Sequence, residues 1–131
     1  MFTARWLKLP VPILENTAFQ GSAGGVSFMS ETKKTRVGII GVGGIANGVH
    51  IPGYLQSENS VISAVCDIDD SALDKASNRC GVPSERCFKD YRDLIACDGV
   101  DVVDICTSNY IHCEIALESI KHNKPFSMEK P

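Results

Sequence analysis

Three small residues, Gly41, Gly43 and Ala46, form a turn pattern that could bind a phosphate group. They come directly after an apolar run, and residues that favour a helix follow them. In a strand-turn-helix unit of this kind, the first glycine permits the tight turn, the second lets a pyrophosphate approach the backbone, and the alanine keeps the helix close to the strand. The anion would meet free amides of Gly44 and Ile45, where the helix dipole favours negative charge. The same pattern also occurs for packing reasons alone, so a second feature is needed.

Asp67 provides that second feature. It stands at the end of another apolar run, residues 61–66. In dinucleotide-binding domains, an acidic residue roughly 20 positions after the glycine-rich turn accepts hydrogen bonds from the adenosine ribose. Asp67 lies somewhat further from the turn than that. Pro52, which is expected to break or kink the intervening helix, explains the extra length. Asp67 would repel a 2′-phosphate, and no arginine follows it at positions 68–70. The sequence therefore predicts a dinucleotide site that favours NAD over NADP, unless Arg79 or Arg92 folds back toward it.

Composition and charge exclude two classes of partner. The 131 residues, 44% of them hydrophobic, are enough for one domain with a core. The formal net charge is -3 and both signs are scattered, so no basic block could follow a nucleic-acid backbone. No apolar run approaches the roughly 18 residues that span a membrane. We expect neither a nucleic acid nor a membrane as partner.

The cysteines indicate a reducing compartment. The sequence has six of them, but no Cys-x-x-Cys pair, and several fall at predicted core positions. A disulfide framework or a zinc site is therefore not expected, and no metal is predicted. We expect buried thiols in a cytoplasmic protein.

Residues 1–30 differ from the rest of the chain. Prolines and glycines punctuate them, and Pro10 and Pro12 interrupt the short apolar run that a signal peptide would need. We expect a disordered or non-native extension here, with Met29 as a plausible native start. The dinucleotide-binding domain is then expected to occupy residues 31–131.

From residue 35 onward, predicted strands and helices alternate. The strands are expected at residues 36–41, 61–66, 87–88, 100–106 and 125–128. The helices are expected at residues 44–56 with an interruption at Pro52, then from Asp69 to a stop at Gly81, from Asp90 to Asp98, and at residues 110–122 with Asn123 as C-cap. This alternation predicts an α/β fold with a doubly wound, Rossmann-like parallel sheet. Ligands bind such sheets at the carboxyl ends of the strands, where residues 41–46, Asp67, residues 107–109 and residues 129–131 would gather.

Two acidic residues interrupt the fourth predicted strand. Asp101 is expected at its solvent end. Asp104 lies within the apolar run, and it is either a hydrogen-bonded strand residue or a functional carboxylate.

In these features the chain resembles the N-terminal half of the glucose-fructose oxidoreductase, inositol dehydrogenase and rhizopine-catabolism (Gfo/Idh/MocA) family. The resemblance extends from about Thr35 to Pro131. Its motifs are Gly41-x-Gly43-x-x-Ala46, Ala64-Val65-Cys66-Asp67, Gly81-Val82-Pro83 before Tyr91-x-x-Leu94, Asp101-x-Val103, Thr107-x-Asn109-x-x-His112, and Glu129-Lys130-Pro131. Ser108 stands where the family commonly has proline.

The resemblance implies roles for five residues near the carboxyl edge. Thr107, Asn109 and His112 would line the cofactor cleft, and Glu129 would contact the nicotinamide ribose region. Lys130 would be the catalytic or orienting lysine, since a nearby ammonium can stabilise a developing carbonyl oxygen or relay its proton. For His112, a helix-terminus histidine satisfied by the backbone is an equal alternative.

The function implied is the cofactor-binding portion of an NAD(P)-dependent oxidoreductase. It would transfer a hydride between nicotinamide and a sugar, inositol or related polyol, and it would form a homo-oligomer when full length. Family members are more than twice as long, so we expect this chain to be truncated before a substrate domain, and we do not expect it to turn over alone. The alternatives are a stand-alone, non-catalytic nucleotide-binding module and a structural remnant that associates through an exposed sheet edge.

Overall fold

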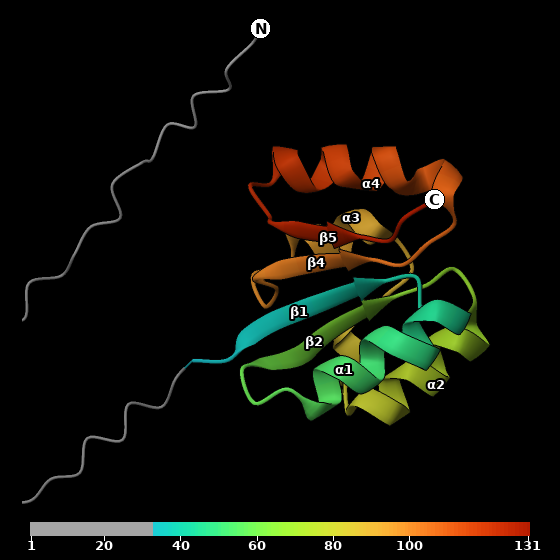
Figure 1. Cartoon of the computed structure of the whole chain (residues 1–131), viewed down its shortest axis with the longest axis vertical. Helices are drawn as coiled ribbons and strands as arrows, with labels where there is room; N and C mark the ends of the chain where they lie inside the picture. The colour runs from blue at the N-terminus through green and yellow to red at the C-terminus, as the bar shows by residue number, and fades with distance from the viewer. Residues whose placement is uncertain (1–32) are drawn as a thin grey trace, which may run out of the picture. The chain divides into compact units, whose positions relative to one another are not determined.

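A five-stranded parallel sheet organises the part of the chain that the computed structural model describes, residues 33–131. The strand order is β3-β2-β1-β4-β5. The strands are β1 (Thr35–Ile40), β2 (Ser60–Cys66), β3 (Cys87–Phe88), β4 (Val102–Ile105) and β5 (Phe126–Met128). The first strand, β1, lies in the middle of the sheet, and the sheet extends outward through β2 to β3 before the chain crosses back to β4 and β5 (Figure 1). The predicted α/β, Rossmann-like parallel sheet is confirmed.

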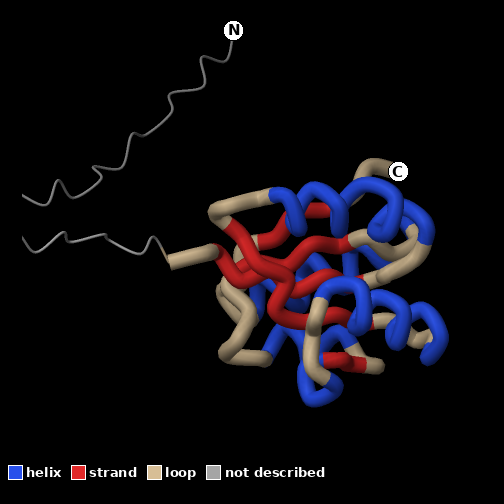
Figure 2. Tube along the Cα trace, turned by 90° about the horizontal axis from the view of Figure 1, so that it is seen from below, coloured by secondary structure: helices blue, strands red, loops and turns tan. Residues whose placement is uncertain are grey.

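Helices cover both faces of this sheet (Figures 1 and 2). They are η1 (Ala46–His50), α1 (Ile51–Gln56), α2 (Asp70–Cys80), η2 (Ser84–Arg86), α3 (Tyr91–Ala96) and α4 (Asn109–Lys121). On the face of α1 and α2, the core contains Ile39, Ile51 and Val65, and on the face of α3 and α4 it contains Leu94, Ile105 and Ile115. Strands enclosed on both faces read as continuous apolar runs, which is why the strands could be located from the sequence.

One irregularity changes the alternation of β2. Val37 pairs with Ile62 and Gly38 pairs with Ala64, so Ser63 has no partner residue on β1. The Ser63 hydroxyl donates to the Val37 carbonyl at 3.3 Å. Because the extra residue shifts the pleat by one, Ile62 and Val65 both join the core on the face of α1 and α2.

Local capping explains where two of the helices begin and end. Asp69 accepts a hydrogen bond from the Ala72 amide at 3.0 Å at the start of α2, and Gly81 ends that helix in the left-handed region with φ 67°. Asp90 accepts from the Arg92 amide at the start of α3. These caps are confirmed as predicted from the sequence.

The first helix has no break at Pro52, where a break or kink was expected. Residues 44–56 are all helical, and the segment η1 has π-helical hydrogen bonding, with the Ile51 amide donating to the Ala46 carbonyl. Pro52 then falls in the first turn of α1. The wider π turn accommodates a ring that would otherwise collide with the preceding turn, so the proline changes the helix type without ending the helix.

The fourth strand is shorter than predicted. β4 covers only Val102–Ile105, and Asp101 lies just before it. Asp101 is only partly exposed and forms an ion pair with Arg36 of β1 at 2.6 Å, while it also accepts from the Arg36 amide. Asp101 thus lies at the end of the strand with its side chain partly exposed, as expected, and its carboxylate in addition joins the starts of two neighbouring strands.

Two further expectations concern the ends of the described region. The prediction of a disordered or non-native extension at residues 1–30 concerns residues outside the described region. At the end of α4, Asn123 takes the left-handed conformation with φ 52°, directly after the C-cap residue His122. In residues 33–131, no helix has the length and apolar character needed to cross a membrane.

Candidate functional site

A cleft of about 250 Å³ opens at the carboxyl ends of β2, β1 and β4. This is the place where the strand order reverses, and ligands of doubly wound sheets bind there. The cleft is lined by the glycine-rich turn, by the end of β2, and by the first turn of α4. The lining residues are Ile40, Gly41, Gly43, Cys66, Asp67, Ile68, Lys89, Tyr91, Cys106, Thr107, Ser108, Tyr110, Ile111 and Ile115.

Gly41 and Gly43 have different roles in the turn. Gly41 has φ 86°, and a Cβ there would lie 2.8 Å from the Thr107 backbone nitrogen, so its role is set by the fold. Gly43 has no such constraint, since a Cβ built on it would meet nothing within 4 Å. Gly43 therefore leaves open space at the cleft wall that the protein itself does not fill.

The other members of the turn lie as the pattern predicts. Ala46 is fully buried against the sheet, whereas Gly44 and Ile45 are exposed in the first helical turn. The structure therefore keeps the first turn of this helix open to the surface beside the cleft.

Asp67 holds the turn in shape. Its Oδ2 accepts from the Val42 amide at 2.8 Å, and its Oδ1 accepts from the Asp69 amide at 2.9 Å. Each carboxylate oxygen keeps further acceptor capacity, and the side chain lines the cleft. The residue predicted to meet the ribose thus also fixes the backbone that would meet the pyrophosphate.

One wall of the cleft is formed by residues that were not predicted from the sequence. Lys89 donates to the Ile68 carbonyl at 2.8 Å and pairs with Asp70 at 2.6 Å. Next to it, Tyr91 donates its hydroxyl to Glu114 on α4. Lys89 gave no signal in the sequence, and Tyr91 belongs to a motif of the family resemblance but was not predicted to line the cleft, because charged and aromatic residues at the start of a helix are common.

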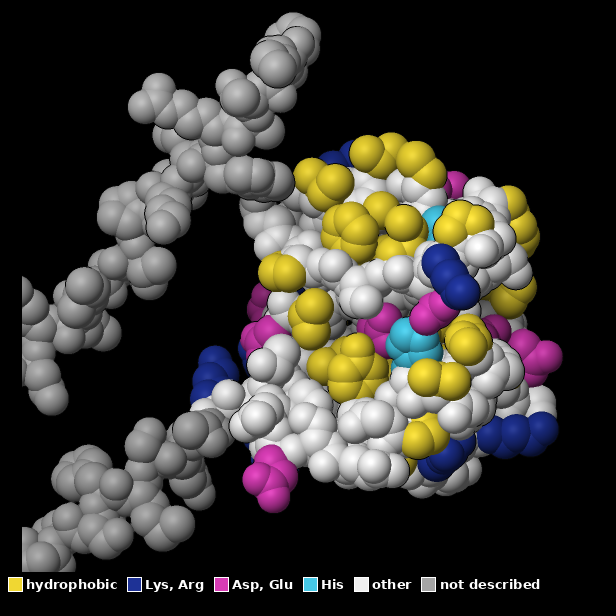
Figure 3. Space-filling view, viewed as in Figure 1, with side chains coloured by type: hydrophobic (Ala, Val, Ile, Leu, Met, Phe, Trp, Pro, Cys, Tyr) yellow, Lys and Arg dark blue, Asp and Glu magenta, His cyan; other side chains and the backbone are white. Residues whose placement is uncertain are grey.

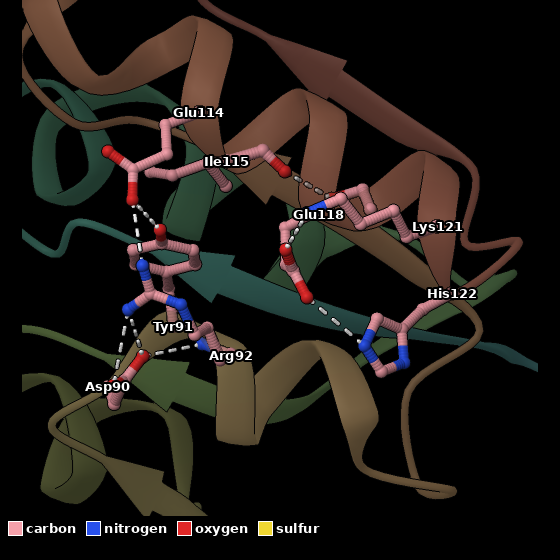
Figure 4. A network of polar contacts seen from close by, with 9 residues as sticks. Asp90, Tyr91, Arg92, Glu114, Ile115, Glu118, Lys121 and His122 are labelled. Atoms are coloured by element: carbon pink, nitrogen blue, oxygen red, sulfur yellow. Dashed lines mark hydrogen bonds and ion pairs between the residues drawn. The ribbon is translucent and has the colours of Figure 1, made fainter.

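Polar contacts between α3 and α4 support that wall (Figure 4). Arg92 binds Glu114 at 2.8 Å and lies over the Tyr91 ring. Loss of solvent, together with the hydrogen bond to Glu114, raises the pKa of Tyr91 to about 12, so the phenol stays protonated and donates. The Tyr91 ring is therefore held in one place against the cleft.

The residues that follow β4 take three different positions. Thr107 and Ser108 line the cleft, whereas Asn109 is exposed at the first residue of α4. His112 is buried beneath the first turn of α4, and its Nε2 lies 2.8 Å from the Thr107 carbonyl oxygen. His112 thus adopts the arrangement in which the backbone satisfies the ring, and it supports the Thr107 segment from behind.

The residues expected after the fifth strand lie outside the cleft lining. Lys130 is exposed. Glu129 is partly buried, and its carboxylate lies 2.8 Å from His50 Nε2, while His50 Nδ1 lies 2.7 Å from Asp104. His50 was not predicted, although an isolated acidic residue in an apolar strand indicates a buried partner of opposite charge. Asp104 is the hydrogen-bonded strand residue of the two alternatives.

Two thiols at the bottom of the cleft are unreactive by environment. Burial raises the pKa of Cys66 to about 12, and burial together with the nearby Asp104 charge raises the pKa of Cys106 well above its usual range. The nucleophilic form of cysteine is the thiolate, so neither residue is suited to covalent chemistry.

Comparison with known proteins agrees with this geometry. Residues 35–131 match the oxidoreductase family with an NAD-binding Rossmann fold (Gfo/Idh/MocA). An inositol 2-dehydrogenase/D-chiro-inositol 3-dehydrogenase from Lactiplantibacillus plantarum is 34% identical over 104 residues, which cover 79% of this chain and 29% of that protein. A myo-inositol 2-dehydrogenase from Thermotoga maritima is 30% identical over 96 residues, 73% of this chain and 28% of that protein.

A solved structure shows the same similarity in three dimensions. The WlbA dehydrogenase from Bordetella pertussis, in complex with NADH and UDP-GlcNAcA, is 27% identical, with a TM-score of 0.69 over 76% of this chain and 29% of that one. The present chain spans less than a third of the length of these relatives.

Proposed function

Because the chain belongs to the oxidoreductase family with an NAD-binding Rossmann fold, we propose that its cleft binds NAD as the cofactor portion of a dehydrogenase. The substrate class we propose is a sugar, inositol or related polyol. The inositol dehydrogenases among its relatives support that class.

One observation carries the cofactor proposal. The open space at Gly43 adjoins Asp67 and Thr107 in a single cleft. A dinucleotide needs a backbone that its pyrophosphate can approach, and it needs an acidic acceptor for the adenosine ribose. Gly43 would supply the open backbone, and Asp67 would supply the acidic acceptor. The hydrogen bond from the Val42 amide to Asp67 joins these two parts of the cleft.

The charges at the cleft favour NAD over NADP. The Asp67 carboxylate would repel a 2′-phosphate at the position where it accepts from a 2′-hydroxyl. Among the described residues that line the cleft, Lys89 is the only lysine or arginine, and Asp70 already pairs with it. A phosphate would have to displace that ion pair.

Two residues after β5 would act in the reaction itself. When bound, the nicotinamide supplies or accepts the hydride, and the protein positions the alcohol or carbonyl carbon of the substrate. Lys130 is exposed and so could reach a substrate oxygen, where an ammonium stabilises developing negative charge. Glu129, adjoining it, would contact the nicotinamide ribose. Thr107 and Asn109, which follow the neighbouring strand β4, would line the cofactor cleft, and His112 would do so by supporting Thr107 from behind.

Gly43→Ala tests the cleft without disturbing the fold. The new methyl group meets no protein atom, so the free energy of unfolding should change by less than about 1 kcal/mol. NADH affinity, measured by calorimetric titration of the 131-residue chain, should fall by about tenfold or more because the pyrophosphate loses its close approach. NADPH should bind the unmodified chain more weakly than NADH.

Gly53→Ala is the matched control. Gly53 lies in α1, and a Cβ there also meets nothing within 4 Å, but it does not line the cleft. This variant should bind NADH like the unmodified chain. Equal affinity of the unmodified chain and the Gly43→Ala variant would contradict the proposed site, as would absence of NADH binding by a folded chain.

A further inference from the structure

His50 joins three elements that are far apart in the sequence. It ends η1, and its ring lies between Asp104 of β4 and Glu129 after β5, with hydrogen-bond distances of 2.7 Å and 2.8 Å. Asp104 is almost fully enclosed at 1% side-chain exposure, whereas Glu129 keeps 30%. The proposed cofactor cleft does not use this imidazole as a lining residue.

The arrangement depends on the protonation state of the ring. Only imidazolium has two N–H donors, so only the charged ring donates to both carboxylates at once. Burial disfavours the charge, but the hydrogen bonds to Asp104 and Glu129 and the attraction of both carboxylates outweigh it, and the pKa of His50 is raised above its ordinary value. At neutral pH the charged ring therefore gains population.

The two hydrogen bonds would not be lost equally on deprotonation. A neutral ring keeps one N–H, and its second nitrogen then presents a lone pair to a carboxylate. Asp104 is almost fully enclosed, and its Oδ1 is buried without a hydrogen-bond partner among the described residues, so losing His50 would cost Asp104 most. Glu129 is partly exposed and can be hydrated, so the Glu129 contact is the one that opens.

The His50–Glu129 contact links two segments on either side of the strand-order switch. η1 belongs to the helix that follows the glycine-rich turn, while the Glu129 amide donates to the Ile105 carbonyl at 3.1 Å and Lys130 comes next. The His50 ring thus ties the helix on one side of the strand-order switch to the segment on the other side.

We propose that His50 is a positioning residue: as imidazolium it fastens Glu129, and with it Lys130, to the helix behind the glycine-rich turn, and as neutral imidazole it releases them. The effect on the cofactor rests on the function proposed above, because it requires that Glu129 and Lys130 face bound NAD. The effect on the protein itself does not.

The other titratable groups around the ring do not compete with this switch. Tyr54 of α1 and Cys106 after β4 lie near Asp104, and burial together with that carboxylate raises the pKa of each well above the physiological range. Cys106, His50 and Asp104 have ligand-type atoms within 4.8 Å of one another. Both His50 nitrogens are already engaged and the thiol is protonated, so a hydrogen-bonded triad of His50, Asp104 and Glu129 describes the site better than a metal centre.

Nuclear magnetic resonance of the full 131-residue chain tests the positioning role. The His50 ring should titrate above the roughly 6.5 of an ordinary histidine, and the Glu129→Gln variant should lower that value. Exchange of the Glu129 amide with solvent should accelerate about tenfold, beyond the intrinsic effect of pH, as His50 loses its proton. In His50→Gln the exchange should be fast at every pH. A His50 ring that titrates at or below the ordinary value, or a Glu129 amide indifferent to His50→Gln, would overturn the proposal.

His122→Gln is the matched control. His122 forms a comparable imidazole-carboxylate pair with Glu118 at 3.3 Å, but it lies at the exposed end of α4. Its replacement should leave the Glu129 amide unchanged. Glu129→Gln removes only the partly exposed partner, so it keeps the experiment decisive if His50→Gln does not fold.

NADH titrations separate this inference from the proposed function. If the cleft binds NADH, affinity should fall about threefold or more from about pH 6 to about pH 9 in the unmodified chain, and should vary less in His50→Gln. A pH-independent affinity with normal binding would overturn the link to the cofactor. Absence of NADH binding, together with the expected resonance results, would contradict the proposed function and leave the positioning role of His50 supported.

Discussion

In the glycine-rich turn, some residues are needed for folding and others are free for binding. Gly41 is required by the protein's own backbone, which approaches it from Cys106 and Thr107, whereas the space at Gly43 serves nothing in the described chain. Asp67 combines both roles, because it orients the Val42 amide and still lines the cleft. The turn is therefore a structural unit in which one position is left free for a ligand.

Gly41→Ala should lower the free energy of unfolding by about 2 kcal/mol or more. A side chain at φ 86° is strained, and its Cβ would lie 2.8 Å from the Thr107 nitrogen and 2.9 Å from the Cys106 carbonyl oxygen. Urea unfolding followed by circular dichroism measures the change. Gly43→Ala serves as the control, and equal stability of the two variants would contradict the geometry of the turn.

At the scale of elements, local chemistry decides where the helices begin and tertiary packing decides how they continue. The α2 helix begins at an aspartate cap and ends at a left-handed glycine, as sequence rules require. The helix after the turn instead contains a π-helical segment before Pro52, and this segment ends at the histidine that bridges Asp104 and Glu129. π-helical turns inside helices often accompany functional sites, which agrees with the placement of His50.

Asp69→Ala should lower the free energy of unfolding, because the Ala72 amide loses its only described cap. Thermal and urea unfolding measure this loss. Asp74→Ala is the control, since Asp74 is exposed within the same helix. The cap also lowers the pKa of Asp69, through the hydrogen bond from the Ala72 amide, so its contribution is present above the unfolded pKa and declines as the pH falls through the folded value. An Asp69→Ala variant as stable as Asp74→Ala would rule out this account of the cap.

At the scale of the described domain, one side of the sheet is left with exposed apolar side chains. They gather over α4 and β5 in the space-filling view (Figure 3) and include Leu117, Ile120, Phe126 and Met128. β5 has β4 as its only neighbour in the described sheet, and all three of its residues are exposed. The opposite edge is shorter, because β3 has only two residues. The two cores, by contrast, are closed around the central strands.

The reactivity of the six free cysteines measures how well the two cores exclude solvent. Cys113 is exposed on α4, whereas Cys66 and Cys106 are buried and have raised pKa values. At about pH 8, iodoacetamide should therefore modify Cys113 first and leave Cys66 and Cys106 intact until the chain unfolds. Mass spectrometry of the native and urea-denatured chain measures the order. Modification of Cys66 in the native chain as fast as Cys113 would show that the sheet is not packed as described.

Features that depend on neighbours along the chain could be predicted before the structure was known. Turn glycines, the caps of Asp69 and Asp90, and the run of alternating strands and helices identified the parallel sheet, and parallel topology brought Gly43, Asp67 and Thr107 to one edge. Such signals are local, because hydrogen bonds of caps and turns close within a few residues.

Contacts between side chains that are distant in the sequence could be identified only in the folded domain. His50 reaches Asp104 and Glu129 across sequence separations of 54 and 79 residues, and Lys89 and Tyr91 line the cleft although no sequence pattern indicated that they would. Those contacts depend on strand register, on the π-helical turn and on side-chain rotamers, each of which is set by packing against the rest of the domain. For that reason the edge of the sheet could be predicted as the site, while the histidine that we propose holds its last segment could not.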